Sequence, residues 1–329
     1  VNVEHPFAQY VRILGKGKSG TRSLDATEAE QAFSMVLRGE VEELQLGAFL
    51  MLLRVKEESA EELVGFVQAC RRHMPTPTTP LTDSLDWSSY AGKKSQQAWY
   101  VLSALLLADN GIRVLMHGSD GHTNERLYSG EVFQFLGIET ANSLEQAETQ
   151  LQATGLAWLP LAHFCPALER IMQLKPLLGL RSPVNTLARL LNPGRCDYSL
   201  QSVFHPAYAT LHQQADRLLG QHRALVFKGD GGEVELKPQA DTRYSLLRDK
   251  HTEEFKWSRQ LDNRPEGVAK LDSTVLLETW RGKVQDTYGE HAVIETCAIA
   301  LLLMERAEDE VAARELAQDF WQNRDRGAL

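Results

Sequence analysis

The sequence predicts an α/β protein with a small N-terminal helical domain, followed by a larger domain built on a mostly parallel central sheet. Helical periodicity fills the first part of the chain, and beyond it short apolar strand candidates alternate with helices, which is typical of an α/β layer architecture. The chain has 329 residues, of which 43% are hydrophobic and 24% charged, so it can bury a full core. We expect a helical domain over 1–75 and an α/β domain over 80–329.

Apolar residues at helical spacing predict four helices in the first domain. The second is expected to begin near Thr27, with Glu30 completing a capping box, and the fourth at Ser59, with Glu62 in the same role. A proline-rich stretch at 74–80 then predicts a linker.

The second domain carries four short apolar runs that predict strands. They are 112–116, 157–161, 200–204 and 224–227. Alternating residues over 233–248 indicate additional strands, and the region from about 290 to 325 is strongly helical in pattern.

The net charge is −9, from 35 basic and 44 acidic residues, which excludes a uniformly basic nucleic-acid coat. The charge is nevertheless segregated. Residues 1–22 hold four bases against one carboxylate, and 170–195 hold five bases with none, whereas 28–62 hold nine carboxylates against three bases. If the two basic segments share a face, they predict a local positive groove that attracts phosphate on an acidic body.

Several classes of protein fit the sequence poorly. The longest apolar run, around 298–304, is too short to span a bilayer, and the first residues lack the pattern of an export signal. Cysteines at 70, 165, 196 and 297 form no CxxC pair, so neither a zinc site nor a disulfide framework is expected. We expect a cytoplasmic protein with reduced cysteines, no bound metal and no membrane contact.

Motifs in the same order along nearly the whole chain resemble those of the anthranilate phosphoribosyltransferase family. They include Gly39-Glu40, Arg54-x-Lys56-x-Glu58, Leu178-Gly179-Leu180-Arg181 and Leu190-x-Asn192-Pro193. The resemblance implies a small helical domain, completed by helices from about 165–195, joined to a larger α/β domain. It also implies a homodimer formed through the helical domain.

The catalytic motifs of that family are degraded in this chain. The family holds phosphoribosyl pyrophosphate (PRPP) on a glycine-rich loop, whose counterpart here, residues 88–94, keeps only Gly92. His117 follows a methionine where the family has lysine, and Glu233-x-Glu235 replaces an adjacent Asp-Glu pair that binds magnesium. Arg181 matches the arginine that binds the anthranilate carboxylate. The resemblance therefore implies a vestigial substrate cleft at Gly92, His117, Arg181 and Glu233, with no cofactor, or Mg²⁺ only if transferase activity persists.

These departures coincide with gains of basic residues, and the pattern resembles the divergent YbiB-type branch, whose members resemble the transferase in fold and bind nucleic acid. We expect sequence-independent contacts to phosphates of single- or double-stranded nucleic acid, DNA or RNA. The candidate contacts are Lys16, Lys18, Arg22, Lys93, Lys94, Arg181, Arg189 and Arg195. Tyr10, Tyr90, Trp99, Tyr100 and Tyr198 are the candidates for base stacking.

Two alternatives remain open at this point. The arginines of 170–195 could simply pair with the acidic helices of the first domain. The chain could also be an active glycosyl or phosphoribosyl transferase with an altered substrate, using Gly92, His117, Arg181 and Glu233.

Overall fold

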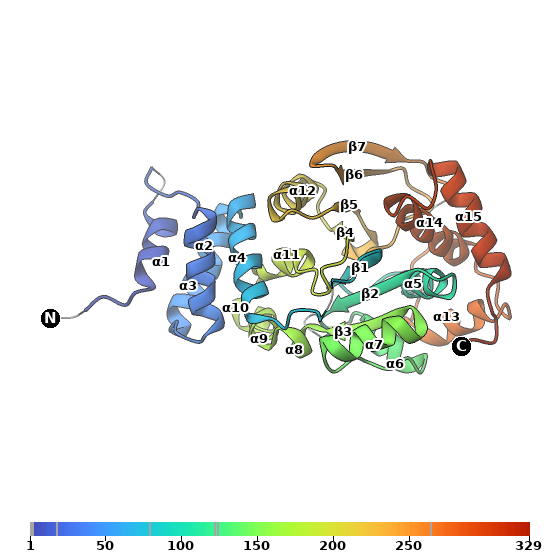
Figure 1. Cartoon of the computed structure of the whole chain (residues 1–329), viewed down its shortest axis with the longest axis horizontal. Helices are drawn as coiled ribbons and strands as arrows, with labels where there is room; N and C mark the ends of the chain where they lie inside the picture. Colours follow the sequence, from blue (N-terminus) through green and yellow to red (C-terminus); the bar gives the residue numbers. More distant parts are fainter. Residues whose placement is uncertain (1–2, 18, 79, 122, 124, 264) are drawn as a thin grey trace.

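A helical layer lies at one end of the molecule and a seven-stranded sheet, covered by helices on both faces, fills the rest (Figure 1). The computed structural model describes residues 3–17, 19–78, 80–121, 123, 125–263 and 265–329. The predicted fold class, a helical domain followed by an α/β domain with a mostly parallel sheet, is confirmed.

The helical layer consists of α1 (Ala8–Gly15), α2 (Ala26–Leu37), α3 (Glu43–Lys56) and α4 (Ala60–His73). Phe49 is fully buried at the centre of this layer and packs edge-on against Phe7 and Phe66, at ring-centroid distances of 5.1 and 6.0 Å. Gly65 lets α2 and α4 approach closely, since a Cβ there would lie 2.4 Å from the carbonyl oxygen of Ala26.

One predicted helix start is wrong and another is confirmed. α2 begins earlier than expected, because Asp25 accepts a hydrogen bond from the Glu28 amide at 2.8 Å and Glu28 accepts one from the Asp25 amide at 3.0 Å. Glu30, which was expected to close the capping box, instead pairs with Arg72 at 2.6 Å. The Ser59–Glu62 box at the start of α4 is present as predicted.

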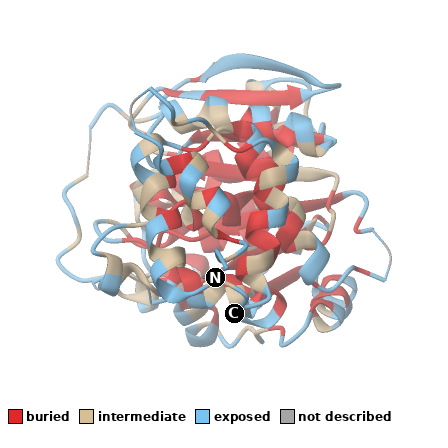
Figure 2. Cartoon of the chain, turned by 90° about the vertical axis from the view of Figure 1, so that its left-hand side faces the viewer, coloured by how far each residue is buried: buried red, intermediate tan, exposed pale blue. Residues whose placement is uncertain are grey.

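The sheet has the order β3-β2-β1-β4-β5-β6-β7, in which the first five strands are parallel and the last two antiparallel. The strands are β1 (Ser84–Ser89), β2 (Arg113–Gly118), β3 (Leu156–Pro160), β4 (Tyr198–Val203), β5 (Arg223–Lys228), β6 (Thr242–Arg248) and β7 (His251–Trp257). The four predicted apolar strands are β2–β5. Of the additional strands expected over 233–248, the structure contains only β6, and β7 follows outside the predicted range. Seen from the helical end, the inner strands are buried whereas the outermost strand, β7, is exposed (Figure 2).

The central strand β1 was not among the predicted strands. All of its residues are buried, yet half of them are serine and one is Asp86, so its composition does not look like that of a core strand. Part of this polar content is satisfied across the sheet. The Ser199 hydroxyl on β4 donates to Asp86 Oδ2 at 3.0 Å, whereas Asp86 Oδ1 and the Ser88 hydroxyl have no hydrogen-bond partner in the described structure.

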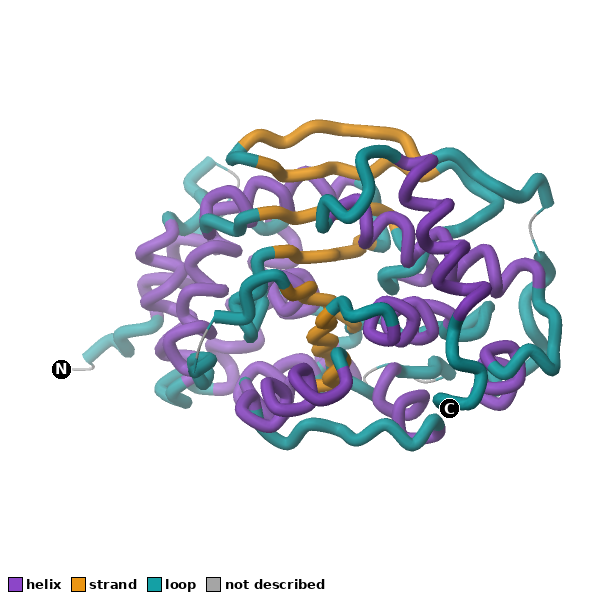
Figure 3. Tube along the Cα trace, turned by 45° about the vertical axis from the view of Figure 1, so that its right-hand side comes forward, coloured by secondary structure: helices purple, strands orange, loops and turns teal. Residues whose placement is uncertain are grey.

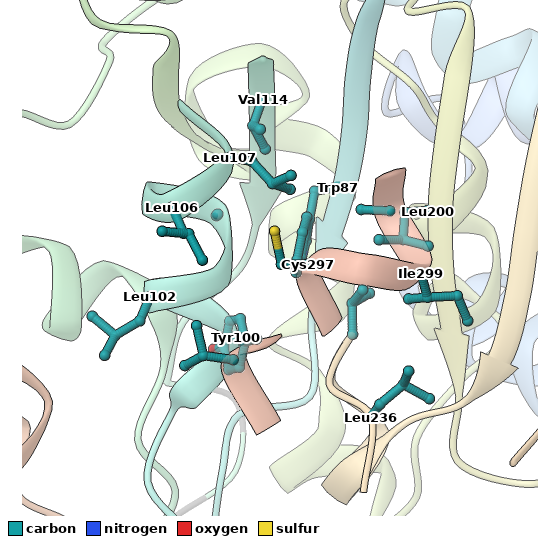
Figure 4. Close-up of a cluster of buried hydrophobic side chains, with 14 of the residues drawn as sticks. Trp87, Tyr100, Leu102, Leu106, Leu107, Val114, Leu200, Leu236, Cys297 and Ile299 are labelled. Atoms are coloured by element: carbon teal, nitrogen blue, oxygen red, sulfur yellow. The ribbon is translucent and has the colours of Figure 1, made fainter. Parts of the chain in front are cut away.

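The remaining helices cover the two faces of the sheet and its ends (Figure 3). They are α5 (Trp99–Asp109), α6 (Ser129–Phe135), α7 (Leu144–Thr154), α8 (Leu161–Phe164), α9 (Pro166–Met172), α10 (Lys175–Leu178), α11 (Val184–Leu187), α12 (Ala207–Leu219), α13 (Ser273–Trp280), α14 (Thr287–Leu303) and α15 (Glu310–Asn323). Trp87 of β1 lies among side chains from three other elements, including Leu107 of α5 and Cys297 of α14 (Figure 4). Within the described residues, no helix is long and apolar enough to cross a membrane.

The short helices α8–α11 lie between the helical layer and the sheet (Figure 1). Arg71 of α4 fixes this region by donating hydrogen bonds to the carbonyl oxygens of Leu191, at 3.0 Å, and Leu190, at 3.2 Å. The helix after Pro183 is short, because α11 gives way to a 3₁₀ turn at Ala188–Leu190. This region brings Arg181 and Arg189 close to the residues that follow β5.

Candidate nucleic-acid interface

The segment at residues 88–94, which we call the phosphate-loop segment, is occupied by a carboxylate of the chain itself. Glu233 is fully buried and accepts hydrogen bonds from the backbone amides of Ala91 and Gly92, both at 2.6 Å. The Ser89 hydroxyl donates to its other oxygen at 2.8 Å. Gly92 has a φ of +69° and leaves no space for a side chain, since a Cβ would lie 3.0 Å from the Tyr128 ring. The donors that the resemblance assigns to a phosphate are therefore satisfied internally.

Lys93, an expected nucleic-acid contact, is buried. Its side chain is 1% exposed, and its ammonium group pairs with both Asp230 and Glu235. Burial lowers the pKa of Lys93, but the two carboxylates outweigh that effect, so the pKa is raised and the lysine stays charged. This corrects the expectation that Lys93 reaches a phosphate: its charge is neutralised inside the protein.

Glu233 and Glu235, which stand where the resemblance places a magnesium-binding pair, do not fit that role. Glu233 is held by the loop amides, and Glu235 binds Lys93 and accepts a hydrogen bond from the Tyr100 amide at 2.9 Å. Magnesium needs several oxygen ligands that can turn toward one ion. The described part of the chain contains no cluster of three or more His, Cys, Asp or Glu residues that could hold a metal.

His117 lies inside the protein and not in an open cleft. It is fully buried at the end of β2, with Nδ1 2.7 Å from the Tyr90 hydroxyl and Nε2 3.2 Å from an oxygen of Asp86. The geometry of the second contact is too poor for a hydrogen bond, so we regard it as an electrostatic contact only. These residues therefore do not line an open substrate cleft. The Gly92 amide donates a hydrogen bond to Glu233, and His117 is buried.

The basic residues of 170–195, which we call the basic segment, differ from Lys93 in that they are not neutralised by carboxylates. They are Arg170, Lys175, Arg181, Arg189 and Arg195. Throughout the described chain, none of these five has a carboxylate within the 4.0 Å that defines an ion pair. The alternative in which they pair with the acidic helices of the first domain is therefore wrong.

Lys175, Arg181 and Arg189 lie close together, and Arg126 from outside the basic segment lies beside them. Burial, together with nearby Arg181 and Arg126, lowers the pKa of Lys175, and burial with nearby Arg126 lowers the pKa of Arg181. Arg189 is nearly buried; burial and then Arg181 lower its pKa, although Glu233 opposes the shift. These four bases form a cationic cluster of Arg126, Lys175, Arg181 and Arg189.

Arg126 was missed from the sequence, where it stands alone among polar residues. Its guanidinium donates to the carbonyl oxygens of Ala91 and Gly92, both at 2.9 Å, and of Gly231, at 3.3 Å. Arg189 similarly donates to the carbonyl of Gly232 at 3.1 Å. Both arginines keep their charge while bonding to neutral carbonyls, so the cluster retains a net positive charge.

Arg181 and Arg189 also line a pocket between the two domains. Arg54 from α3 and His205, Tyr208 and His212 beside or within α12 also line it, and none of its described lining residues is acidic. Arg54 lies 3.4 Å from the Tyr208 hydroxyl. We call this cavity the arginine pocket.

The other expected contacts lie apart from the cationic cluster or are paired. Arg22 makes a two-point ion pair with Glu28, at 2.6 and 2.7 Å, and Lys94 is exposed but lies 3.2 Å from Glu125. Lys16 is exposed after α1, and Lys18 falls outside the described residues. Arg195 lies in a turn before β4, near Arg71 and not beside Arg181.

The stacking candidates are mostly buried. Tyr10, Tyr90, Trp99 and Tyr100 are at most 5% exposed, and only Tyr198 is partly accessible. The first four are therefore core residues, which corrects that expectation.

Comparison with known proteins places the chain in a family. Residues 9–74 match the helical bundle domain of a glycosyl transferase family, and residues 98–323 match its α/β domain. The chain is 31% identical to YbiB of Escherichia coli K12 over 246 residues, which is 73% of this chain and 76% of YbiB. It is 27% identical to an anthranilate phosphoribosyltransferase of Oceanobacillus iheyensis over 307 residues, 91% of this chain and 89% of that protein.

Solved structures show the same fold. Anthranilate phosphoribosyltransferase from Thermus thermophilus superposes with a TM-score of 0.79 at 20% identity, covering 97% of this chain and 94% of that one. The enzyme from Saccharomyces cerevisiae, solved in complex with PRPP and Mg, gives 0.77 at 16% identity, covering 96% and 93%. The chain therefore belongs to the glycosyl transferase family that includes anthranilate phosphoribosyltransferase, and within it to the YbiB-type branch.

Proposed function

We propose that this chain binds nucleic acid through sequence-independent phosphate contacts and uses the transferase fold as a scaffold. One observation supports this most directly: the five bases of the basic segment have no carboxylate partner in the described structure. Unpaired cations that repel one another are stabilised by a bound polyanion, whose phosphates also release counterions when they bind.

The proposed contacts combine the cationic cluster with an exposed base beside it. Arg181, Lys175 and Arg126 form the centre, and exposed Lys94, whose partner Glu125 precedes Arg126 in the chain, extends the surface. An exposed pair such as Lys94–Glu125 contributes little energy, so Lys94 can exchange its partner for a phosphate. Lys93 is left out because its charge is already neutralised.

We further propose that the protein acts as a homodimer through its helical layer. Leu44 of α3 is 90% exposed and Leu177 of α10 is 84% exposed, and both are large apolar side chains that a subunit interface would cover. Two-fold symmetry would present two cationic clusters to one strand. We expect this assembly in the cytoplasm.

Transfer of a phosphoribosyl group is the alternative, and the occupied phosphate-loop segment argues against it. PRPP would have to displace the Glu233 carboxylate from two amides and a hydroxyl, and magnesium would have to displace Lys93 from Glu235. The names of the transferase relatives favour this alternative, so the test includes it.

The test compares oligonucleotide binding with PRPP binding. Fluorescence anisotropy with a labelled oligonucleotide should give an affinity that falls steeply with salt. The double variant Lys175→Glu/Arg181→Glu should lose about 100-fold in affinity and reduce the salt slope by about 2. The matched variant Arg12→Glu/Arg22→Glu makes the same change in net charge at two arginines of the helical layer outside the cationic cluster, and should change affinity less than about threefold.

Calorimetry of the wild-type protein with PRPP and Mg²⁺ tests the transferase alternative. We expect no heat of binding. Saturable PRPP binding, together with no oligonucleotide binding at low salt, would overturn the proposal in favour of a transferase.

A further inference from the structure

Phe204 is an exposed aromatic side chain at the edge of the arginine pocket. It follows β4 directly and is 48% exposed, although most large apolar residues of the chain are buried. The ring of His205 meets it edge-on, with centroids 4.9 Å apart and planes at 81°. The backbone of Gly232 lies beneath it, where a Cβ would be 3.6 Å from the ring. The phenyl ring is thus in contact with His205 and close to the Gly232 backbone, while about half of the residue stays exposed to a ligand.

The arginine pocket lies on one side of Phe204. Its volume is about 140 Å³, and Arg54, Arg181 and Arg189 give it three positive charges with no acidic lining residue. Asn185 and Thr186 add polar groups to the wall. This composition suits a phosphate or another group of the phosphodiester backbone.

A second, larger cavity lies on the other side. Its volume is about 660 Å³, and its basic lining residues are Lys228, Lys237 and Arg243. Neither Lys228 nor Arg243 has a carboxylate within ion-pair distance among the described residues. Two acids also line this cavity, Asp241 and Glu254, and Asp241 is neutralised by Lys256 at 2.7 Å.

The beginning of α12 separates the two cavities. Phe204, His205 and Tyr208 face the arginine pocket, whereas Pro206, Ala207 and Thr210 line the second cavity. The first residues of α12 therefore form the ridge between the two cavities, and Phe204 lies at its edge.

We propose that a single strand of nucleic acid crosses this ridge, with one base stacked on Phe204 and the flanking phosphates in the two cavities. This inference rests on the proposed function and adds the class of nucleic acid and its path. Stacking on an exposed ring requires a base that is not already paired and stacked in a duplex, and stacking is tolerant of sequence because every base has an aromatic face.

The first test replaces the aromatic ring. Phe204→Ala should weaken binding of a single-stranded oligothymidylate by at least about fivefold at constant salt, and leave binding of a duplex of the same length within about twofold. Phe135→Ala on α6 is the matched control, because Phe135 is equally exposed at 48% and lies far along the chain from both cavities. Phe204→Trp should restore or exceed wild-type affinity, which a merely structural role of the phenyl ring would not predict.

The second test addresses the larger cavity. Lys228→Glu/Arg243→Glu should lower the slope of log affinity against log salt by about 1.4 for the single strand. Arg248→Glu/Lys250→Glu, at the other end of the β6–β7 hairpin, should leave that slope unchanged.

The outcomes separate this inference from the proposed function. If wild-type protein binds no oligonucleotide, the proposed function fails. If wild-type protein binds both forms, and Phe204→Ala behaves like Phe135→Ala on the single strand, the path across the ridge is wrong while nucleic-acid binding stands.

Discussion

The phosphate-loop segment and the basic segment meet at the carboxyl ends of the parallel strands, yet their electrostatic states are opposite. In the first, Lys93 is enclosed by Asp230 and Glu235, and the loop amides are bound to Glu233. In the second, Arg181 and Lys175 have no acidic partner in the described structure, and burial together with nearby bases lowers the pKa of each. The site where the family binds PRPP is thus neutralised from within, whereas the neighbouring surface keeps an uncompensated positive charge.

This contrast shows why counting charges cannot locate a binding surface. Lys93 and Lys94 are adjacent in sequence, but one is 1% and the other 59% exposed in its side chain. A buried cation with two carboxylates offers nothing to a ligand, because removing it from its partners costs several kcal/mol. Accessible cations without partners require no such separation before they bind phosphate.

The largest expected effect is on the free energy of unfolding, when the buried cation of either segment is replaced by methionine. Lys93→Met leaves Asp230 and Glu235 buried without their common partner, so the free energy of unfolding should fall by about 3–5 kcal/mol. Arg189→Met also removes a buried cation, but one that bonds only to the Gly232 carbonyl, which accepts a second hydrogen bond from Ser202. It should cost less than about 1 kcal/mol.

Denaturation by urea, monitored by circular dichroism, measures both variants. The contrast predicts a large difference between two substitutions that each remove one buried positive charge. Equal losses from Lys93→Met and Arg189→Met would mean that pairing does not distinguish the two segments.

A smaller loss of stability is expected when the Glu233 carboxylate is removed from the phosphate-loop segment. Glu233→Ala removes the acceptor of the Ala91 and Gly92 amides, which should cost about 2 kcal/mol of stability because buried donors lose their hydrogen bonds. Inorganic pyrophosphate should then raise the melting temperature of the variant and leave that of the wild-type protein unchanged, since an added anion can take the place of the carboxylate.

Glu131→Ala is a suitable control for that experiment. Glu131 is a partly exposed helical glutamate on α6, outside the contacts of the loop amides. A pyrophosphate effect of the same size in wild-type protein and in Glu233→Ala would show that the anion binds elsewhere.

The layer architecture could be predicted from the sequence, because periodic apolar residues report directly on which faces are buried. The apolar strands β2–β5 and the helices α14 and α15 follow that rule. β1 does not, since its polar residues find partners in distant segments: Asp86 accepts a hydrogen bond from Ser199 on β4, and Ser89 bonds to Ser129 and Glu233. Polar core strands of this kind become visible only once their tertiary partners are known.

The site was predicted only where a residue's role depends on local sequence. Arg181 was recognised from its motif and lies in the cationic cluster, and the loss of glycines identified the altered loop. Burial of Lys93 depends on Asp230 and Glu235, more than a hundred residues away, so no local pattern could indicate it. Arg126 and Phe204 were missed for the same reason: their surroundings come from distant segments.

The smallest expected effect is on the pH dependence of folding stability, and it comes from Asp120, a carboxylate near Glu233. Asp120 follows β2, and burial, together with Glu131, Glu169 and Glu233, raises its pKa to about 6 despite a hydrogen bond from the Gly130 amide. In the unfolded chain it titrates near 3.9, so between about pH 4 and pH 6 the folded state holds a proton that the unfolded state has released.

Folding stability should therefore fall as pH rises through that window. Two pKa units correspond to about 2.7 kcal/mol, and because Asp120 is only half-buried, solvent screening reduces the expected fall to about 1 kcal/mol. Asp120→Asn removes this contribution, so the variant should gain stability relative to wild-type protein as the pH rises from 4 to 6, and the difference should level off above about pH 7. Urea denaturation at several pH values measures that difference, in which the titration of the other carboxylates cancels. A constant difference across the window would mean that Asp120 is ionised in the folded protein, and that the carboxylates around the phosphate-loop segment are less crowded than their burial indicates.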